Sequence, residues 1–359
     1  MNEINQDLVR GLWDMQNEYR KVKSNRIKSI NKINEFASNG VPFLLISDFE
    51  EQDIIITPLE DLQQDSLKYW INGQTNHEKL DKKLNNIQIQ KHPLPFYTYK
   101  TAFNLVQKNI LLGNSFLTNL TCETPIDLNI SLLDVFEQSD ARYKIYIQDQ
   151  FVCFSPEIFV KIDESGKISS FPMKGTIDAS IENAEKIIQT DKKEFYEHTT
   201  IVDLIRNDIS KIANKVWVEK FRYIDKIQTS NNKELLQVSS IVSGLLSDNW
   251  RENLGEIIFS LLPAGSISGA PKDKTLEIIA EAEKYTYQLQ FGKMTYKRGF
   301  YTGICGIFDG KTFDSGVMIR FIENTGNGLV YKSGGGITAR SVAENEYQEM
   351  IQKIYVPII

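Results

Sequence analysis

Hydrophobic residues recur along the chain at two spacings, one typical of helices and one typical of strands. Residues 5–37 carry Leu8, Leu12 and Met15 at helical spacing, which predicts a helix near the start of the chain. The run VPFLLISDFE that follows Gly40 predicts a buried strand. Helix and strand signals therefore alternate from the first residues onward.

Residues 149–175 predict a pair of strands that lead to a lysine. Apolar and polar residues alternate on both sides of the turn DESG at 163–166, which is the pattern of a β-hairpin. The hairpin is expected to end at Lys174, which would lie just beyond a strand end. The position is notable because a proline turn precedes the lysine and Gly175 follows it.

The second half of the chain continues the alternation. Residues 183–213 predict a long helix, residues 299–338 predict strands with turns at 309–310 and 326–328, and residues 341–355 predict a terminal helix. The positions of the long helix that are expected to face the core are Phe195, Val202, Ile205, Ile209 and Ile212. The chain lacks a βαβ repeat and a Pro/Gly/Ser-rich linker, so we expect one α+β domain with antiparallel sheet and flanking helices.

Composition narrows the class of protein. The 359 residues are 41% hydrophobic, enough for a large core, and the net charge is −6 with 41 basic residues interleaved among 47 acidic ones. This balance disfavours nucleic acid or a membrane as partner. Charged residues throughout the first twenty positions exclude a signal-peptide core there, which favours a cytoplasmic protein. Cys122, Cys153 and Cys305 are widely spaced, as expected of buried thiols.

Two pairs of glutamates are spaced to project from one helix face each. Glu194 and Glu197 are three residues apart on one predicted helix, and Glu346 and Glu349 are three apart on another. Two such faces could share Mg²⁺, which prefers carboxylate oxygens, whereas the His and Cys ligands of a zinc site are missing. Solvated helix surface is the alternative, and spacing alone leaves both open.

Three further features have two interpretations each. The run SGGGIT at 333–338 could present backbone N–H groups to an anion or form a plain tight turn. The segment AGSISGAPK at 264–272 superficially matches a phosphate-binding loop but lacks its arrangement of Gly, Lys and Ser or Thr, so ATP hydrolysis is disfavoured. Arg320 is a charge within an apolar segment, where it could bind a ligand carboxylate or pair with a protein carboxylate.

The order of the motifs decides between these interpretations. They are SPEIF (155–159), PMKGT (172–176), KEFYEHTTIVDLIRND (193–208), AGSISGAPK (264–272), YTGICG (301–306), IR (319–320), GGGI (334–337) and EYQEMIQK (346–353). Together they resemble the chorismate-utilising enzymes, which include anthranilate synthase component I, aminodeoxychorismate synthase component I, isochorismate synthase and salicylate synthase.

The resemblance implies a fold and a domain organisation. The family fold is a large sandwich of two antiparallel sheets with helices on the outside, which holds Mg²⁺ and chorismate in a deep cleft. Residues 95–359 are then expected to form the chorismate-binding catalytic core, and residues 1–94 a shortened N-terminal part of the same domain.

The resemblance also implies roles for individual residues. The metal glutamates of the family match Glu197 and Glu349, with Glu194 and Glu346 beside them, and its general acid matches Glu157. The residues that match substrate-binding positions are Tyr301, Arg320, Gly334, Gly335, Gly336, Lys353, Thr176 and Ser268. A dianionic substrate needs such cations, oriented N–H groups and a metal ion.

Lys174 favours one activity within the family. The P-x-K-G-T form is typical of aminodeoxychorismate synthases, in which the lysine is thought to attack C2 of chorismate, expel the C4 hydroxyl and leave again after ammonia adds at C4. The attack requires a neutral amine, so we expect the pKa of Lys174 to be lowered. Glu157 should stay protonated in order to deliver a proton to the departing hydroxyl.

Several positions depart from the family pattern. Leu117 stands where water-activating relatives have a lysine base, which disfavours isochorismate synthesis, and where ammonia users commonly have glutamine. Gln237 replaces a usual histidine, and the ARSVAEN run around Arg340 is also atypical. Two alternatives therefore stay open, namely anthranilate synthase component I and a catalytically impaired chorismate-binding protein.

The proposed reaction needs a source of ammonia, and the sequence gives no sign of one within this chain. The three histidines, His77, His92 and His198, are scattered and do not form a Cys-His-Glu glutaminase set. A separate glutamine amidotransferase subunit is the implied partner, and the product would lead to p-aminobenzoate and folate.

Overall fold

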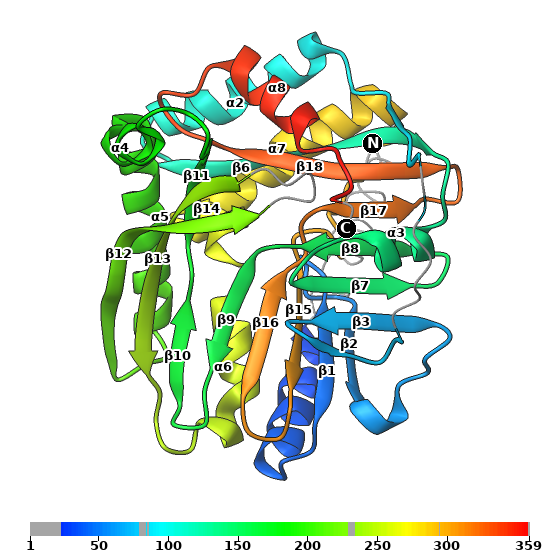
Figure 1. Ribbon diagram of the computed structural model, residues 1–359, viewed down its shortest axis with the longest axis vertical. Coiled ribbons are helices and arrows are strands. Elements are labelled where there is room, and N and C mark those ends of the chain that lie inside the picture. The colour runs from blue at the N-terminus through cyan, green and yellow to red at the C-terminus, as the bar shows by residue number, and fades with distance from the viewer. Residues whose placement is uncertain (1–22, 79–83, 85, 229–233, 294, 358–359) are drawn as a thin grey trace, which may run out of the picture.

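The computed structural model describes residues 23–357, except 79–83, 85, 229–233 and 294. Within these residues, the strands form two antiparallel sheets of nine strands each. We call them sheet A, whose strands run vertically in Figure 1, and sheet B, whose strands run horizontally. The α+β sandwich predicted from the sequence is confirmed.

Sheet A contains, in spatial order, β11 (Met173–Asp178), β13 (Glu234–Leu245), β10 (Lys167–Ser170), β9 (Ile158–Ile162), β16 (Phe313–Val317), β15 (Ile304–Phe308), β1 (Phe43–Ser47) and β2 (Ile54–Pro58), with β12 (Lys215–Gln228) paired to β13. Sheet B contains β14 (Gly269–Ala270), β6 (Leu117–Leu128), β18 (Leu329–Ile337), β17 (Phe321–Asn324), β8 (Phe151–Ser155), β7 (Tyr143–Ile147), β3 (Leu67–Ile71) and β4 (Gln74–Thr75), with β5 (Ile89–Lys91) paired to β6.

Helices cover the outer faces of both sheets. The described helices are residues 23–38, α2 (Phe96–Leu111), α3 (Leu132–Gln138), α4 (Ala184–Thr190), α5 (Lys192–Ser210), α6 (Leu254–Leu261), α7 (Lys272–Phe291) and α8 (Ala343–Gln352), with short 3₁₀ turns η1 (Leu59–Asp61), η2 (Trp250–Asn253) and η3 (Gly265–Ile267). In Figure 1, α2, α7 and α8 lie over sheet B, and α5 contacts β11, β12 and β13 of sheet A. None of these described helices combines the length and apolar character needed to cross a bilayer.

Strand β1 explains why the apolar run after Gly40 is continuous rather than alternating. Phe43 and Leu45 face the core between sheet A and its helices, whereas Leu44 and Ile46 face the core between the two sheets. A strand buried on both faces needs apolar residues at every position. The sequence therefore predicted this strand correctly. The predicted helix before it is confirmed over residues 23–38, and its earlier part lies outside the described residues.

The predicted turns have the chemistry that their residues indicate. Asp163 accepts hydrogen bonds from the backbone N–H groups of Ser165 and Lys167 at the β9–β10 turn, and Gly166 adopts a φ of 80°. Strands β9 and β10 pair in the register Ile162 to Ile168, so the hairpin is confirmed. The strand pairs β15–β16 and β17–β18 are confirmed in the same way.

Two chain segments cross from one sheet to the other, and they lie against each other. Residues 155–158 lead from β8 in sheet B to β9 in sheet A, and residues 317–321 lead from β16 in sheet A to β17 in sheet B. The N–H of Val317 donates to the carbonyl of Glu157 at 3.0 Å, and the N–H of Phe154 donates to the carbonyl of Arg320 at 3.0 Å. These bonds hold the two crossings together at the inner edge of the sandwich.

The long helix predicted over residues 183–213 is divided at Asp191. This residue ends α4 and begins α5, where its carboxylate accepts a hydrogen bond from the N–H of Glu194 at 2.9 Å. An aspartate cap satisfies a backbone donor that a continuous helix would have paired internally. Val202, Ile205 and Ile209 are buried as predicted, and Ile212 is partly buried.

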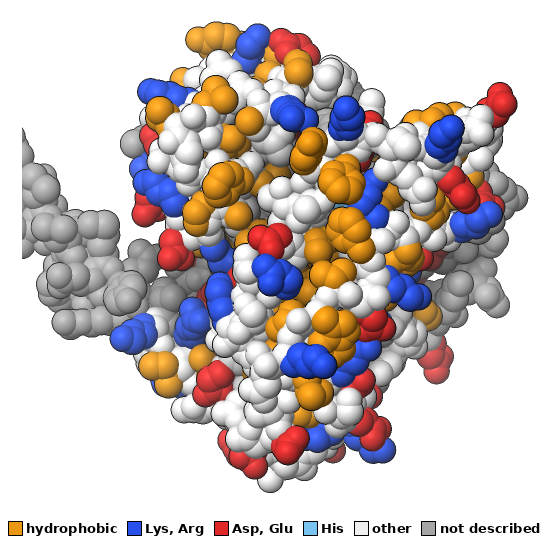
Figure 2. Space-filling model, turned by 90° about the vertical axis from the view of Figure 1, so that its left-hand side faces the viewer, with side chains coloured by type: hydrophobic (Ala, Val, Ile, Leu, Met, Phe, Trp, Pro, Cys, Tyr) orange, Lys and Arg blue, Asp and Glu red, His pale blue; other side chains and the backbone are white. Residues whose placement is uncertain are grey.

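The prediction that Phe195 faces the core is wrong. Its side chain is 41% exposed and meets the ring of Phe221 edge-on at the surface. The ring of Phe195 also meets that of Tyr196, which is exposed as well. Figure 2 shows that exposed apolar side chains form a band over one face of the molecule. Helical spacing alone could not distinguish a core contact from this surface cluster.

Candidate active site

A cleft with a volume of about 460 Å³ contains most of the residues that the sequence singled out. Its wall includes Glu157, Lys174, Thr176, Glu194, Glu197, Tyr301, Arg320, Gly334, Gly335, Gly336, Glu346, Glu349 and Lys353. They come from both sheets, from α5 and α8, and from the two crossings between the sheets. Residues spread over almost 200 positions of the chain thus meet in one cavity.

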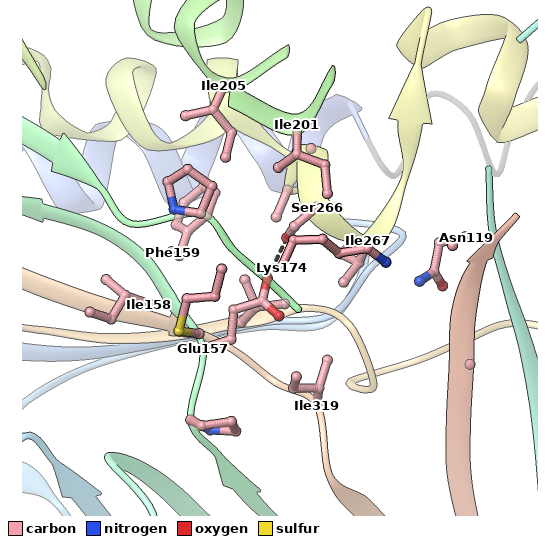
Figure 3. A pocket seen from close by; sticks show the side chains of 18 of the residues that line it. Asn119, Glu157, Ile158, Phe159, Lys174, Ile201, Ile205, Ser266, Ile267 and Ile319 are labelled. Atoms are coloured by element: carbon pink, nitrogen blue, oxygen red, sulfur yellow. Dashed lines mark hydrogen bonds between the residues drawn. The ribbon is translucent and has the colours of Figure 1, made fainter. Parts of the chain in front are cut away.

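Glu157 lies on the crossing from β8 to β9, where it is partly buried. Its carboxylate accepts a short hydrogen bond from the hydroxyl of Ser266 (Figure 3). Burial raises the pKa of Glu157, although the Ser266 hydroxyl, Arg320 and Lys353 each act to lower it. A carboxyl group in this environment can keep its proton at a higher pH than a solvated glutamate, as a proton donor requires.

The structure corrects one substrate-binding prediction. Ser268 is fully buried and is not part of the cleft wall, because its hydroxyl donates to the carbonyl of Ala264 at 2.9 Å. Ser266, two residues earlier, lies in the wall instead. Both serines belong to the AGSISGAPK motif, but only the 3₁₀ turn η3 determines which of them faces the cavity. The motif therefore predicted correctly that this segment lines the cleft, but it did not show which of the two serines faces the cavity.

Lys174 is the second residue of β11 rather than a residue beyond a strand end, because Pro172 separates β10 from a further strand. Its ammonium group is 2.8 Å from Oε2 of Glu197, and the side chain reaches into the cleft near Ser266 and Ile267 (Figure 3). Burial acts to lower the pKa of Lys174, but the carboxylates of Glu197, Glu194 and Glu349 outweigh it, so the pKa is raised. The predicted lowering of this pKa is therefore wrong.

Gly175 explains why glycine follows the lysine. It adopts a φ of 84°, and a Cβ atom there would lie 2.9 Å from Oε2 of Glu194. A side chain at this position would strain the backbone and push against the carboxylate. The glycine therefore lets Glu194 approach β11 next to Lys174, and Thr176 then lies exposed at the edge of the cleft.

The glutamates of α8 face the same cavity from the other sheet. Glu346 is buried beside Gly335, and Oε1 of Glu349 is 2.8 Å from the ammonium group of Lys353. The same ammonium group donates to the carbonyl of Gly334 at 2.9 Å. Burial lowers the pKa of Lys353, and the carboxylate of Glu349 offsets part of this effect. The two pairs of glutamates are thus brought together in one cleft rather than spread over solvated helix surface.

The four glutamates suit Mg²⁺ by their chemistry, since hard divalent cations prefer carboxylate oxygens. Their oxygens do not converge, however: in the described part of the chain, no three His, Cys, Asp or Glu side chains are arranged to hold a metal ion. Lys174 and Lys353 instead contribute the positive charges next to Glu197 and Glu349.

The run SGGGIT is part of a strand rather than a tight turn. Gly334, Gly335 and Gly336 lie in β18, where they pair with Thr121, Leu120 and Asn119 of β6. A Cβ atom at Gly334 would lie 2.5 Å from the carbonyl oxygen of Leu120. The glycines thus form a strand without side chains, which leaves room for a ligand against the backbone.

Arg320 and Tyr301 add further polar groups to the wall. Arg320 lies on the crossing from β16 to β17 with a φ of 56°, and its guanidinium group lies 5.3 Å from the ring centroid of Tyr355. Arg320 forms a side-chain hydrogen bond with Tyr355, and it lines the cleft, where its positive charge could meet an anionic ligand. Burial raises the pKa of Tyr301 to about 12, so its hydroxyl stays protonated and able to donate.

Three residues of the cleft wall were not predicted as site residues. Two of them were noted only as departures from the family pattern, and the third was not noted. Leu117 presents an apolar side chain that lies against Gly336, and Gln237 pairs with Thr176 across β13 and β11. Asn119 was not predicted, although it also lines the cavity (Figure 3). The signal that could have found it is alternation: Leu117 and Asn119 are two apart on β6 and therefore face the same side.

A buried ion pair supports the wall from behind. Arg298 contacts Glu283 of α7 through two hydrogen bonds of 2.9 and 2.6 Å, and also donates to the carbonyls of Ile267 and Asn119. Both charged side chains are almost fully buried. The pair therefore connects α7 to η3 and β6, two of the elements that form the cleft.

Replacing Arg298 with alanine is expected to destabilise the fold by about 3–5 kcal/mol, because the carboxylate of Glu283 would stay buried without its partner. Urea unfolding followed by circular dichroism measures the change. The matched control is Arg206→Ala, since Arg206 forms an exposed pair with Asp203 at 2.8 Å and should change stability by less than about 1 kcal/mol. Equal losses in both variants would contradict the prediction.

Comparison with known proteins identifies the family of the chain. The family of chorismate binding enzymes matches residues 16–358, nearly the whole chain. The chain belongs to this family. Among similar proteins of the family, an "Uncharacterized PabA-like protein" of Haemophilus influenzae is 47% identical over 92% of this chain and 96% of the relative. Aminodeoxychorismate synthase component 1 of Bacillus subtilis is 27% identical over 87% of this chain and 71% of the relative.

Solved structures of chorismate-utilising enzymes share the fold. Anthranilate synthase component I of Streptococcus pneumoniae has a TM-score of 0.60 at 24% identity and covers 76% of this chain and 60% of that chain. The menaquinone-specific isochorismate synthase of Escherichia coli has a TM-score of 0.65 at 16% identity, over 90% of this chain and 79% of that chain. These likenesses show that the chain has the two-sheet fold of these structures.

Proposed function

We propose that this chorismate-binding enzyme converts chorismate and ammonia into 4-amino-4-deoxychorismate. The observation that carries the proposal is the position of Lys174, whose amine lies in the same cleft as the partly buried acid Glu157 and the arginine Arg320. Similarity to aminodeoxychorismate synthase component 1 of Bacillus subtilis supports it. Leu117 is a further support, because an apolar side chain cannot activate water for isochorismate synthesis.

The substrate carboxylates would be held by groups from both sheets. Arg320 and Lys353 supply positive charge, and Tyr301 supplies a hydroxyl donor. Because Gly334 to Gly336 have no side chains, the substrate can approach their backbone closely. Charge-assisted hydrogen bonds of this kind orient a planar dianion and fix which ring carbon faces each reactive side chain.

The reaction would proceed in two displacements. The neutral amine of Lys174 attacks C2 of chorismate, the ring double bonds shift, and the C4 hydroxyl leaves as water with the proton of Glu157. Ammonia then adds at C4, the double bonds shift back, and the lysine amine leaves C2. The sum is chorismate plus ammonia to 4-amino-4-deoxychorismate plus water. Lys174 must separate from Glu197 before the first step, because a protonated amine is not a nucleophile.

Mg²⁺ is the cofactor that we propose, with Glu197 and Glu349 as ligands and Glu194 and Glu346 beside them. When bound, the cation would balance the carboxylates of the cleft and attract an anionic substrate.

Glu349→Gln is expected to weaken Mg²⁺ binding by roughly tenfold or more, because a neutral amide is a poor ligand for a hard cation. Isothermal titration calorimetry with MgCl₂ measures the change without any enzymatic reaction. Glu277→Gln is the control, since Glu277 is an exposed residue paired with Lys274. Unchanged Mg²⁺ affinity in Glu349→Gln would contradict the assignment of this ligand.

Ser266→Ala is expected to shift the pH dependence of kcat. The Ser266 hydroxyl lowers the pKa of Glu157, so its removal raises that pKa further. Because Glu157 donates its proton, kcat falls as pH rises through this pKa. The alkaline limb of the plot of kcat against pH should therefore move to higher pH, by as much as about one pH unit. Ser268→Ala is the control, since its hydroxyl bonds Ala264 and should leave the limb in place. Identical limbs in both variants would contradict the prediction.

The ammonia would come from a separate glutamine amidotransferase subunit. Of the three histidines in the chain, His198 is buried against Ser240, His77 pairs with Glu137, and His92 pairs with Asp127. None of these contacts forms the Cys-His arrangement of a glutaminase.

Product analysis tests the proposed function directly. The protein is incubated with chorismate, MgCl₂ and ammonium, and the products are separated by chromatography with fluorescence detection. We expect 4-amino-4-deoxychorismate. Anthranilate as the main product, or chorismate left unchanged, would overturn the proposal in favour of anthranilate synthesis or of an impaired chorismate-binding protein.

A further inference from the structure

Each of the two glutamates that we propose as metal ligands is held by a lysine. Lys174 lies 2.8 Å from Oε2 of Glu197, and Lys353 lies 2.8 Å from Oε1 of Glu349. The first pair connects β11 to α5 on sheet A, and the second joins α8 to its C-cap residue Lys353 beside sheet B. Both pairs line one cleft, so each lysine occupies the charge position that a cation would take.

The two lysines differ in what else holds them. Lys353 has a second acceptor, the carbonyl of Gly334 at 2.9 Å, which would retain its ammonium group if Glu349 turned to a metal ion. For Lys174, the contacts among described residues provide Glu197 as the hydrogen-bond acceptor. Loss of Glu197 would therefore release Lys174, whereas loss of Glu349 would leave Lys353 anchored.

Glu197 cannot favourably bind the ammonium group of Lys174 and a divalent metal ion at the same time. The side chain of Glu197 is only 6% exposed, so water screens little of the repulsion between two cations on the same carboxylate. That repulsion is twice as large for a divalent ion beside an ammonium group as for two unit charges at the same distance.

We propose that Lys174 and a divalent cation are alternative partners of Glu197, so that cation binding transfers Glu197 to the metal and releases the Lys174 side chain into the cleft. This inference rests on the proposed function, because it uses the glutamates assigned there to Mg²⁺. It assigns Lys174 a role before the reaction begins: its ion pair keeps Glu197 neutralised and the amine engaged until the metal arrives. Metal binding and exposure of the nucleophile are then one event.

Zero-length crosslinking tests the exchange without any turnover. A water-soluble carbodiimide joins an amine and a carboxylate that are in direct contact, so the wild-type protein without Mg²⁺ should form a Lys174–Glu197 amide, detected by peptide mass spectrometry. Saturating MgCl₂ should reduce this crosslink at least about fivefold, because contact between the pair is lost. NaCl at equal ionic strength should not. The exposed pair Lys274–Glu277, at 2.6 Å, is the internal control and should be unaffected by Mg²⁺.

A second measurement asks whether the two cations compete. Removing the competitor in Lys174→Met should tighten Mg²⁺ binding by roughly tenfold in calorimetry, while Lys274→Met should leave the affinity unchanged. A Lys174–Glu197 crosslink that persists at saturating Mg²⁺, or that never forms without Mg²⁺, overturns the exchange.

The failure of the exchange and the failure of the proposed function have different signatures. If calorimetry shows Mg²⁺ binding to the wild type and the crosslink is unaffected, the exchange is wrong and the metal site stands. If Mg²⁺ does not bind to the wild type with chorismate present, the proposed metal site itself is wrong, and the exchange with it.

Discussion

Lys174→Ala is expected to lose the formation of 4-amino-4-deoxychorismate by at least about a thousandfold, or on the order of 4 kcal/mol of activation free energy, because the variant has no amine to form the C2 adduct. Chorismate should still bind, since Arg320, Tyr301 and Lys353 stay in the cleft. Ammonia that enters at C2 directly would give anthranilate instead, so the remaining product should change as well as the rate.

Intact-protein mass spectrometry identifies the adduct. Wild-type protein is incubated with chorismate and MgCl₂ but without ammonia, and peptide mapping then locates any added mass. We expect it on Lys174 and on no residue of Lys174→Ala. Lys161→Ala is the matched control, because Lys161 is a partly buried lysine of sheet A that pairs with Asp314 at 2.8 Å, outside the cleft wall. Unimpaired amination by Lys174→Ala would end the covalent mechanism.

Glu157→Gln is expected to lower kcat by about 10²- to 10⁴-fold, the usual contribution of a positioned general acid. The amide keeps the shape of the side chain but cannot protonate the C4 hydroxyl as it leaves. KM should change much less than kcat, because Glu157 would act on the transition state rather than on substrate binding.

Steady-state kinetics with ammonium as the nitrogen source measures both constants. The control is Glu164→Gln, which changes an exposed glutamate in the β9–β10 turn of the same hairpin and should retain full activity. A rise in KM with kcat unchanged would show that Glu157 contributes to binding and not to proton transfer.

The sequence by itself determined most of the elements and their pairing along the chain. The reason is that strands, turns and helix faces depend on residues within a few positions of one another. The DESG turn needs only Asp163 and Gly166 to reverse the chain, and β1 reads as a buried strand because both of its faces are apolar. Ordered motifs likewise indicated the family and the segments of the cleft.

Tertiary structure decided which side chains meet and in which protonation state. Glu157 and Arg320 lie 163 positions apart and come together only because two crossings between the sheets bond to each other. Alternation along η3 could not tell Ser266 from Ser268, since a 3₁₀ turn presents one of them to the cavity and buries the other.

The pKa of Lys174 shows the same division most clearly. Its sequence context, in a motif of amine-using enzymes, favoured a lowered pKa. The value depends instead on the balance between burial and the carboxylates of α5 and α8, and the packing of α5 against β11 brings Glu197 to 2.8 Å from the amine. Electrostatic partners act through space over a few ångströms, so only the folded chain determines which charges lie within that range.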